Sequence, residues 1–371
     1  MNEYEIIIVG AGPAGSAAAI RLANRAPQLA ARALVLDKAI FPRQKLCGGG
    51  VTQHAWDLLR ELNVTLDVPA YPIHHMRLVY DDLETTFHWR NLFRVVQRAE
   101  FDSALLQQAQ ARGVQVQQGV GVREIARDDA GVTLHTDAGE FRARVVIGAD
   151  GANSVVRQQL GLVRSDRISR LIEILTPVQD AACTPEFANH TAVFDFTPVA
   201  RGVQGYYWDF PSYRNGAPVM NRGLFDSRVR ADRARAALKP VLADELRKRG
   251  LEIGAWRLEG HPERWFDPSE QHSVPRVVLA GDAAGTEPWL GEGISHALDF
   301  GIRAADYVID SVARDDFSFA DYARTIAQSR LGQRLRLKRF IAHCVYGKRG
   351  EWFYRGGWRM LQVGLMFLRR T

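Results

Sequence analysis

The sequence EIIIVGAGPAG, residues 5–15, decides the fold. Its first five residues form a short apolar run, which is typical of a strand buried on both faces. Gly10, Gly12 and Gly15 then give the pattern G-x-G-x-x-G, and the alanine-rich segment from about Pro13 to Asn24 is expected to be a helix. Such a turn lets a pyrophosphate approach the free N–H groups at the start of the helix.

A second apolar run, Ala33 to Leu36, predicts another buried strand and ends at Asp37. An acid about 20 residues after the glycine-rich turn is placed to bond a ribose hydroxyl. That carboxylate favours an unphosphorylated ribose, and hence NAD or FAD over NADP. The first forty residues therefore predict a Rossmann-like α/β domain that binds a dinucleotide, and they leave the choice between NAD and FAD open.

The composition is that of an ordinary globular protein, with 371 residues of which 46% are hydrophobic and 24% charged. This length predicts about two domains. The three cysteines, Cys47, Cys183 and Cys344, have unrelated spacings, which excludes a disulfide scaffold and a C-x-x-C site. His74 and His75 would face opposite sides of a strand. We therefore expect no metal site.

Charge is concentrated at the C-terminal end, where residues 330–371 hold eleven arginines or lysines and one acid. So local a bias does not indicate a nucleic-acid partner. Leucines and aromatic residues alternate with these basic residues. We expect either a peripheral contact with the inner face of an anionic membrane or a helical cap with a solvated basic face. With no leader and no apolar run of about 18 residues, a cytoplasmic protein is expected.

A pass along the chain predicts two domains and a tail. Strand-like segments rich in aromatic residues run from about 168 to 225, an amphipathic helix from about 231 to 248, and a buried strand at 277–280. The expected organisation is a dinucleotide-binding domain over 1–165 with inserted β segments at about 65–95, a substrate domain with a mixed, mainly antiparallel sheet over 166–270, the second part of the dinucleotide-binding domain over 271–315, and a helical basic region over 316–371.

Further motifs resemble those of the flavoprotein monooxygenase superfamily, whose members are like para-hydroxybenzoate hydroxylase. They are VVIGADGANSVVR at 145–157 and AGDAAGTEPWLGEGISHALDFG at 280–301. The resemblance covers about residues 4–312 and implies that the cofactor is FAD. It also implies that Asp282 bonds the ribityl chain and that the helix after Gly291 directs its N-terminus at the flavin.

The segment VVQRAEFDSALLQQAQARG, residues 95–113, is also similar to the superfamily, and this implies that Arg98 reaches the cofactor. No second glycine-rich turn is present, so NAD(P)H is expected to dock transiently, with an electron-carrier protein as the alternative donor. The expected cofactor-binding residues are Gly10, Gly12, Pro13, Ala14, Gly15, Asp37, Lys38, Arg43, Cys47, Gly48, Gly49, Arg98, Val122, Asp150, Gly151, Gly281, Asp282, Pro288, Gly291, Gly293 and Ile294.

Two local patterns resemble the geranylgeranyl reductase family within that superfamily. FPRQKLCGGG at 41–50 is similar to its P-R-x-K-x-C-G-G loop, and YYWDFP at 206–211 is similar to its Y-x-W-x-F-P motif. The family has a lysine after that proline, where this chain has Ser212. The departure argues against a substrate whose phosphate such a lysine would bind.

Aromatic residues alternate along the second motif, so Tyr206, Trp208 and Phe210 are expected on one face of a strand. With Pro211 they form the expected pocket for an apolar ligand, and plain core packing is the alternative. Cys47 lies between Lys45 and Gly48, and basic neighbours are expected to lower the pKa of its thiol. A small buried residue packed against the flavin is the other interpretation of Cys47.

The candidate catalytic residues are Cys47, Tyr206 and Trp208. The resemblance implies reduction of C=C bonds in a prenyl, lipid or polyene-like substrate, with electrons from NAD(P)H or a carrier protein. Alternatives are a hydroxylase that consumes NAD(P)H and O₂, a flavin-dependent halogenase, and a flavin-binding protein without catalysis. The halogenase motif W-x-W-x-I-P differs from this chain at Tyr206 and Phe210.

Overall fold

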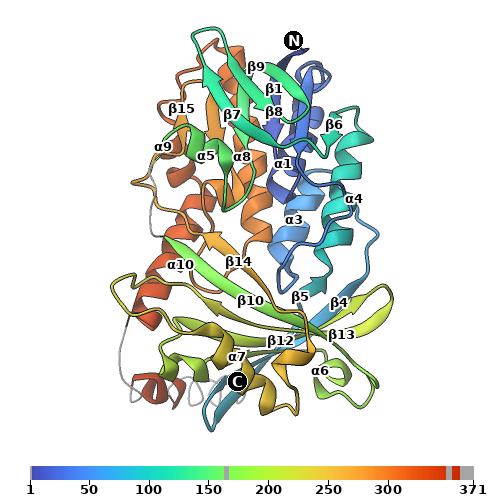
Figure 1. Cartoon of the computed structure of the whole chain (residues 1–371), viewed down its shortest axis with the longest axis vertical. Helices are drawn as coiled ribbons and strands as arrows, with labels where there is room; N and C mark the ends of the chain where they lie inside the picture. The colour runs from blue at the N-terminus through green and yellow to red at the C-terminus, as the bar shows by residue number, and fades with distance from the viewer. Residues whose placement is uncertain (1, 163–166, 348–352, 360–371) are drawn as a thin grey trace, which may run out of the picture.

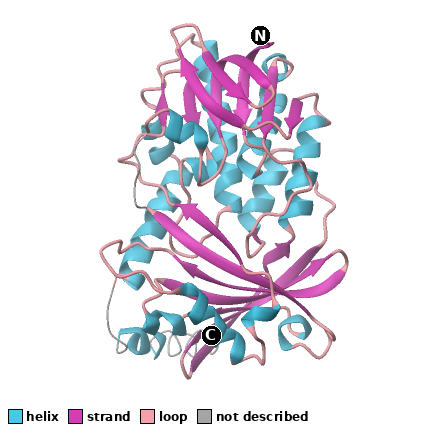
Figure 2. Ribbon diagram, in the orientation of Figure 1, coloured by secondary structure: helices cyan, strands magenta, loops and turns pink. Residues whose placement is uncertain are grey.

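The computed structural model describes residues 2–162, 167–347 and 353–359. Within these residues the chain forms two sheets of eight strands each. Figure 1 shows one sheet at the top and the other below it, and Figure 2 shows that a layer of helices separates them. The expected α/β class, with a second sheet domain and a helical C-terminal region, is confirmed.

The upper sheet has a parallel core in the order β16-β9-β1-β2-β6, which is a Rossmann-like arrangement built from both expected parts of the dinucleotide-binding domain. Ile6, Ile7 and Ile8 are fully buried, because helices and further strands cover both faces of this core. Its strands are β1 (Asn2–Val9), β2 (Ala33–Asp37), β6 (Gln115–Gln118), β7 (Val122–Arg127), β8 (Val132–Thr136), β9 (Gly139–Gly148), β15 (Ser273–Val274) and β16 (Val277–Leu279).

The helices between the sheets hold the cofactor half of the molecule together. Helix α1 (Pro13–Arg25) packs against the long helix α8 (Ile294–Ala313). The two helices are so close that a Cβ on Gly301 would lie 2.1 Å from the carbonyl oxygen of Ala14. The Arg21 Nε–Asp306 Oδ1 ion pair, at 2.7 Å, joins the same two helices. The helices of this half are α1 (Pro13–Arg25), α2 (Pro27–Ala30), α3 (Gln53–Glu61), α4 (Arg98–Gln110), α5 (Val155–Gln159), η3 (Gly281–Ala283) and α8 (Ile294–Ala313).

The lower sheet has the order β14-β10-β13-β12-β11-β4-β5-β3, and its pairs are antiparallel apart from β11 with β4. The β segments expected at about 65–95 are β4 and β5, and they pair in this sheet. Its strands are β3 (Gly50–Thr52), β4 (Ala70–Tyr80), β5 (Leu83–Val96), β10 (Ile168–Pro177), β11 (Thr191–Asp195), β12 (Gly205–Arg214), β13 (Ala217–Asp226) and β14 (Glu259–Arg264).

Short helices accompany this sheet: α6 (Pro185–Ala188), η1 (Thr197–Arg201), α7 (Leu238–Arg247) and η2 (Ile253–Ala255). The helix expected from about 231 therefore begins only at Leu238. The guanidinium of Arg228 donates to the carbonyl oxygens of Ala231, Arg233 and Ala234, at 3.1, 3.0 and 3.3 Å. Those contacts hold residues 231–234 in a turn, which a sequence pattern of alanine and arginine does not reveal.

The C-terminal region forms α9 (Tyr322–Gln328) and α10 (Arg330–Tyr346). Leu331 and Leu335 are buried, and the Arg339 Nη1–Asp267 Oδ2 ion pair measures 2.7 Å, so one face of α10 packs on the protein. No helix among the described residues is both long and apolar enough to cross a membrane. The domain boundary expected at 165 and the parts 348–352 and 360–371 of the expected helical basic region lie outside the described residues.

Candidate cofactor and substrate site

Two neighbouring cavities lie between the helical layer and the lower sheet. The larger measures about 460 Å³ and begins at the carboxyl ends of β1, β2 and β9. The smaller measures about 180 Å³. The residues that line both are Cys47, Leu171, Gly291, Gly293 and Ile294. The two cavities therefore meet at the loop around Cys47 and at the start of α8.

The glycine-rich turn has the geometry that a bound phosphate needs. Gly10 has φ +101°, and a Cβ there would lie 2.4 Å from the carbonyl oxygen of Ala149. A Cβ on Gly15 would lie 1.8 Å from the carbonyl oxygen of Gly10, so only glycine lets α1 pack this close to β1. Gly12 caps α1 without a side-chain acceptor. The first N–H groups of the helix are thus available to an anion in the larger cavity.

Asp37 ends β2 and lines the larger cavity, as the spacing predicted. Its Oδ2 accepts from the backbone N–H of Ala11 at 2.7 Å, and its Oδ1 accepts from that of Ala39 at 2.8 Å. The carboxylate therefore fixes the glycine-rich turn. Each oxygen has a further lone pair with which it can accept from a ribose hydroxyl.

Two arginines supply positive charge to this cavity. Arg98 donates through Nε and Nη2 to the two carboxylate oxygens of buried Asp102, each at 2.8 Å, and Arg43 Nη2 lies 3.1 Å from Asp102 Oδ2. Burial by itself lowers the pKa of Arg98, but Asp102 and Cys47 raise it by more. The net pKa is therefore above the ordinary value, and Arg98 stays charged.

The second arginine has unused donor capacity beside the phosphate-binding turn. Arg43 Nη1 is buried and has no hydrogen-bond partner among the described residues. A Cβ on Gly12 would lie 3.7 Å from Arg43 Nη2. A buried guanidinium nitrogen without an acceptor is costly, and a pyrophosphate oxygen would satisfy it. These residues therefore fit FAD: the helix N-terminus and Arg43 would donate to its diphosphate, and Asp37 would accept from its ribose.

Most of the expected cofactor residues line the larger cavity. Gly48 and Gly49 instead line the smaller cavity. Gly15, Gly281 and Pro288 line neither; a Cβ on Gly281 would lie 2.7 Å from Ala14 Cβ, so this glycine serves close packing. The expected residues that line the larger cavity are Gly10, Gly12, Pro13, Ala14, Asp37, Lys38, Arg43, Cys47, Arg98, Val122, Asp150, Gly151, Asp282, Gly291, Gly293 and Ile294.

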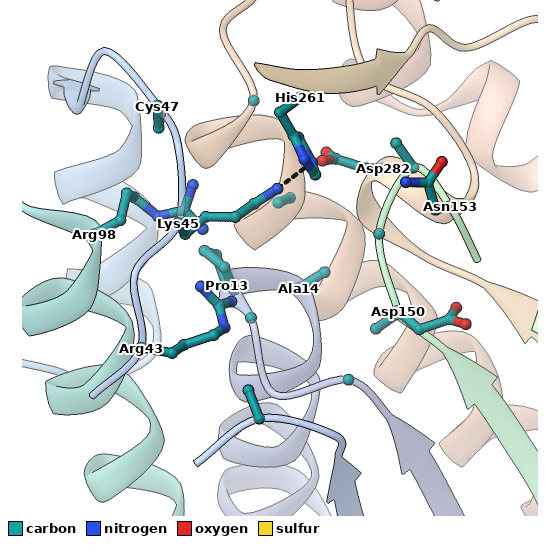
Figure 3. A pocket seen from close by; sticks show the side chains of 18 of the residues that line it. Pro13, Ala14, Arg43, Lys45, Cys47, Arg98, Asp150, Asn153, His261 and Asp282 are labelled. Atoms are coloured by element: carbon teal, nitrogen blue, oxygen red, sulfur yellow. Dashed lines mark hydrogen bonds between the residues drawn. The ribbon is translucent and has the colours of Figure 1, made fainter. Parts of the chain in front are cut away.

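Asp150 lines this cavity, but its carboxylate has partners within the protein. Oδ1 accepts from the hydroxyl of Ser154 at 2.5 Å, and Oδ2 accepts from the backbone N–H of Val156 at 3.1 Å. In Figure 3 the carboxylate of Asp150 points away from Lys45 and His261. Its side chain therefore orders the start of α5.

A lysine and a histidine meet inside the larger cavity (Figure 3). Lys45 Nζ donates to Nε2 of His261, which comes from β14 of the lower sheet. Burial, followed by the charge of Lys45, lowers the pKa of His261 to about 3, so the imidazole is a neutral acceptor. Burial also lowers the pKa of Lys45, against the attraction of Asp282. No sequence motif surrounds His261, so its place in this cavity could not be predicted from the sequence.

Cys47 lies at the junction of the two cavities. Its backbone N–H donates to Glu173 Oε1 at 3.2 Å, and its carbonyl oxygen accepts from Asn221 Nδ2 at 3.0 Å. Burial raises the pKa of the thiol, although Arg98 opposes the shift. The expected lowering of this pKa by basic neighbours is therefore wrong, since the loss of solvation outweighs their charge.

The smaller cavity is lined mainly by apolar side chains. Tyr206, Trp208 and Phe210 line it from β12, as their alternation predicted. The Tyr206 hydroxyl donates to the carbonyl oxygen of Leu290 at 2.6 Å, and Trp208 Nε1 donates to Asn221 Oδ1 at 2.8 Å. Their polar atoms are thus satisfied by the protein, which leaves the ring faces to an apolar ligand. The other apolar lining residues are Met76, Leu92, Phe93, Leu171, Phe194, Leu290 and Ile294.

Pro211 was expected in this pocket and does not line it. It follows Phe210 on β12, and successive strand residues face opposite sides of the sheet. The motif thus contributes its three aromatic residues to the cavity and keeps its proline outside.

The comparisons with known proteins agree with this geometry. The family model described as "FAD binding domain" matches residues 3–299. An uncharacterized protein of Methanosarcina barkeri is 30% identical over 354 residues, which are 94% of this chain and 85% of that protein. A menaquinone reductase of Mycolicibacterium smegmatis is 28% identical, over 91% of this chain and 86% of the relative.

Two further comparisons are with proteins whose names contain the word geranylgeranyl. A digeranylgeranylglycerophospholipid reductase of Methanosphaera stadtmanae is 26% identical, over 92% of this chain and 86% of the relative. A solved geranylgeranyl bacteriochlorophyll reductase-like protein of Thermoplasma acidophilum has the same fold, with a TM-score of 0.76, 22% identity, and coverage of 94% of this chain and 87% of the other. The match over most of its length shows that the chain belongs to the FAD-binding domain family and is an FAD-dependent oxidoreductase.

Proposed function

We propose that this protein reduces C=C bonds of a prenyl, lipid or polyene-like apolar substrate. The observation that carries the proposal is the aromatic cavity of about 180 Å³ that meets the cofactor cavity at Cys47 and Gly291. A chain of apolar carbons gains free energy by leaving water for such a cavity, roughly 25 cal/mol per Å² of buried surface. Two relatives, named for menaquinone and for digeranylgeranylglycerophospholipid, reduce molecules that carry isoprenoid chains.

The chain's own residues bind the substrate and hold the proton that the reduction requires. FAD, when bound, supplies the hydride for one carbon of the double bond. The other carbon needs a proton, and the Cys47 thiol lies at the junction and keeps its proton because burial raises its pKa. Burial also raises the pKa of Glu173 to about 7, and this acid accepts from the backbone N–H of Cys47. Both groups are therefore proton reservoirs near neutral pH.

Electrons are proposed to come from NAD(P)H that docks transiently, or from an electron-carrier protein. The support is that the sequence has a single glycine-rich dinucleotide turn, which FAD would occupy. Rapid mixing of the oxidised protein with NADH or NADPH under argon tests this. Bleaching of the flavin within the turnover time supports a nicotinamide donor, and no bleaching favours a carrier protein.

One experiment separates the candidate activities. The purified protein is reduced without oxygen, mixed with prenyl lipids, and followed by flavin absorbance and product mass. Anaerobic reoxidation with a product that has gained two hydrogens per double bond supports the reductase. Turnover only with oxygen, with an added hydroxyl group, would instead make the protein a hydroxylase. The second outcome is worth testing because a rifampicin monooxygenase is 26% identical over 81% of this chain.

A peripheral membrane contact is proposed for the exposed face of α10. Leu337 and Phe340 are 59% and 66% exposed, whereas Leu331 and Leu335 on the same helix are buried. Arg334 and Arg336 are also exposed on it. Apolar side chains flanked by arginines suit the surface of an anionic bilayer, from which a lipid substrate would enter. Lys338, between these apolar residues, reaches Glu292 at the edge of the smaller cavity.

A further inference from the structure

A buried glutamate that no motif announced lies against the loop where the two cavities meet. Glu263, on β14, is 7% exposed and lines the larger cavity. A Cβ on Gly291 would lie 3.1 Å from its Oε2, and a Cβ on Gly293 would lie 3.0 Å from its Oε1. The carboxyl group therefore contacts the two glycines that precede α8.

This carboxyl group has an unsatisfied oxygen. Oε1 accepts from the hydroxyl of Thr286 at 3.2 Å. Oε2 is buried and has no hydrogen-bond partner among the described residues. An ionised carboxylate in that position would lack the donors that normally offset its burial. A protonated carboxyl group needs fewer donors and has a hydrogen of its own to donate.

Charged neighbours on each side favour the protonated form. Burial raises the pKa of Glu263 well above its ordinary value, and the nearby carboxyl groups of Asp282 on η3 and Glu287 in the following loop raise it further. Lys45 opposes them but already contacts His261. Three acids around one loop cannot all ionise cheaply. Glu287 pairs with Lys338 and Asp282 is only half-buried, so among the described residues of this loop Glu263 is the acid that is both buried and without an ion pair.

The position of Glu263 along the cavity identifies the part of FAD that it faces. The phosphate-binding turn and Asp37 occupy one end, so the diphosphate and the adenosine ribose belong there. FAD is elongated, and its ring must lie at the opposite end, near Cys47, Gly291 and Gly293. The N-terminus of α8, a helix of 20 residues, points to the same end and favours negative charge.

We propose that Glu263 is held neutral and donates a hydrogen bond to the flavin ring at the start of α8, where it stabilises the negative charge that reduction places near N1 and the C2 carbonyl. It is a cofactor-positioning residue of the substrate domain, acting from β14. The proposal concerns FAD, which the family establishes, and does not depend on the substrate.

Midpoint potentials of FAD-loaded variants test this directly. Glu263→Gln keeps a neutral donor and is expected to leave the potential unchanged. Glu263→Leu removes the donor and is expected to weaken the preference for reduced flavin about tenfold, which is ~30 mV for a two-electron couple. Glu259→Gln is the matched control, because Glu259 lines the same cavity from the same strand and is 36% exposed at its side chain.

Two results would overturn the proposal. A clear rise of the potential in Glu263→Gln would mean that the native carboxylate is charged. An unchanged potential in Glu263→Leu would mean that no hydrogen bond is lost. If Glu263→Leu does not retain FAD, infrared spectra of the native protein and Glu263→Gln decide instead. The native protein is expected to have the carbonyl band of a protonated carboxyl group at neutral pH that Glu263→Gln lacks, and the absence of that band in the native protein contradicts the proposal.

Discussion

The indole of Trp208 occupies the space above Gly223: a Cβ on this glycine would lie 2.4 Å from Trp208 Cζ2. Gly223 pairs with Trp208 on one side and with Glu173 on the other. The strand order β10-β13-β12 therefore places an acid, an open position and an indole in one row. The row thus links Glu173, which accepts from the backbone N–H of Cys47, to the indole that lines the smaller cavity.

Gly223→Ala is expected to displace the indole of Trp208 and to narrow the smaller cavity. The added methyl would also lie 2.4 Å from the carbonyl oxygen of Ile172, so overpacking costs about 1–3 kcal/mol of unfolding free energy. Urea unfolding and the KM for an apolar substrate measure the two effects. Gly254→Ala adds the same methyl where no atom lies within 4 Å. Equal behaviour of the two variants would contradict the assigned contact.

Alanine substitutions at two glycines of the phosphate-binding turn are expected to impair different properties, FAD affinity in one case and protein stability in the other. Gly12→Ala meets only Arg43 Nη2 at 3.7 Å, so the apoprotein should fold normally while FAD binds at least tenfold more weakly. Gly15→Ala would place its methyl 1.8 Å from the carbonyl oxygen of Gly10, so the apoprotein itself should lose stability. Thermal melting of each apoprotein and FAD titration separate the cases. A normal FAD affinity in Gly12→Ala would contradict the proposal that the diphosphate of FAD binds at this turn.

Glu173 is expected to make stability fall as the pH rises. Its pKa is about 7 in the folded protein and near 4.5 in the unfolded chain, so the folded state holds the extra proton between these values. The stabilisation is complete below pH 4.5 and is lost as the pH rises through about 7. Glu173→Gln should thus be more stable than the native protein at pH 8, by up to about 3 kcal/mol, and similar at pH 4.5. A stability difference that is the same at both pH values would contradict the assignment.

The sequence predicted the parts of the site that local rules determine. Gly10, Gly12 and Asp37 follow from the geometry of one strand–turn–helix unit, and alternation on β12 placed Tyr206 and Trp208 on one face. Residues that depend on strand register were missed. Glu173 pairs with Glu259 on β14, and Leu171 pairs with His261, although about 90 residues separate the strands.

Other errors came from burial and side-chain contacts. Whether the pKa of Cys47 falls or rises depends on how much protein covers it, and the neighbouring basic residues in sequence do not report that. The contact between Lys45 and His261 brings together a loop of the first domain and a strand of the second, and no spacing rule relates the two. Gly48 was expected at the cofactor, but its position against Phe210 and Trp208 follows from packing between domains.

The exposed face of α10 is expected to govern membrane binding. The double substitution Leu337→Ser and Phe340→Ser should reduce partitioning into anionic vesicles about tenfold, because two large side chains no longer leave water. Vesicle flotation measures this. Ile40→Ser is the control, since Ile40 is 72% exposed but lies far from α10 in sequence. Equal partitioning of the double variant and the native protein would remove α10 from the contact.

An apolar ligand in the smaller cavity is expected to lie next to the flavin. The most direct measurement is a titration of the oxidised, FAD-loaded protein with a saturated polyprenyl lipid, followed by flavin absorbance under argon. We predict a saturable change in the flavin spectrum for the native protein, and a loss of that change in Trp208→Ala, which should still bind FAD. Saturable lipid binding without any change in the flavin spectrum would contradict the claim.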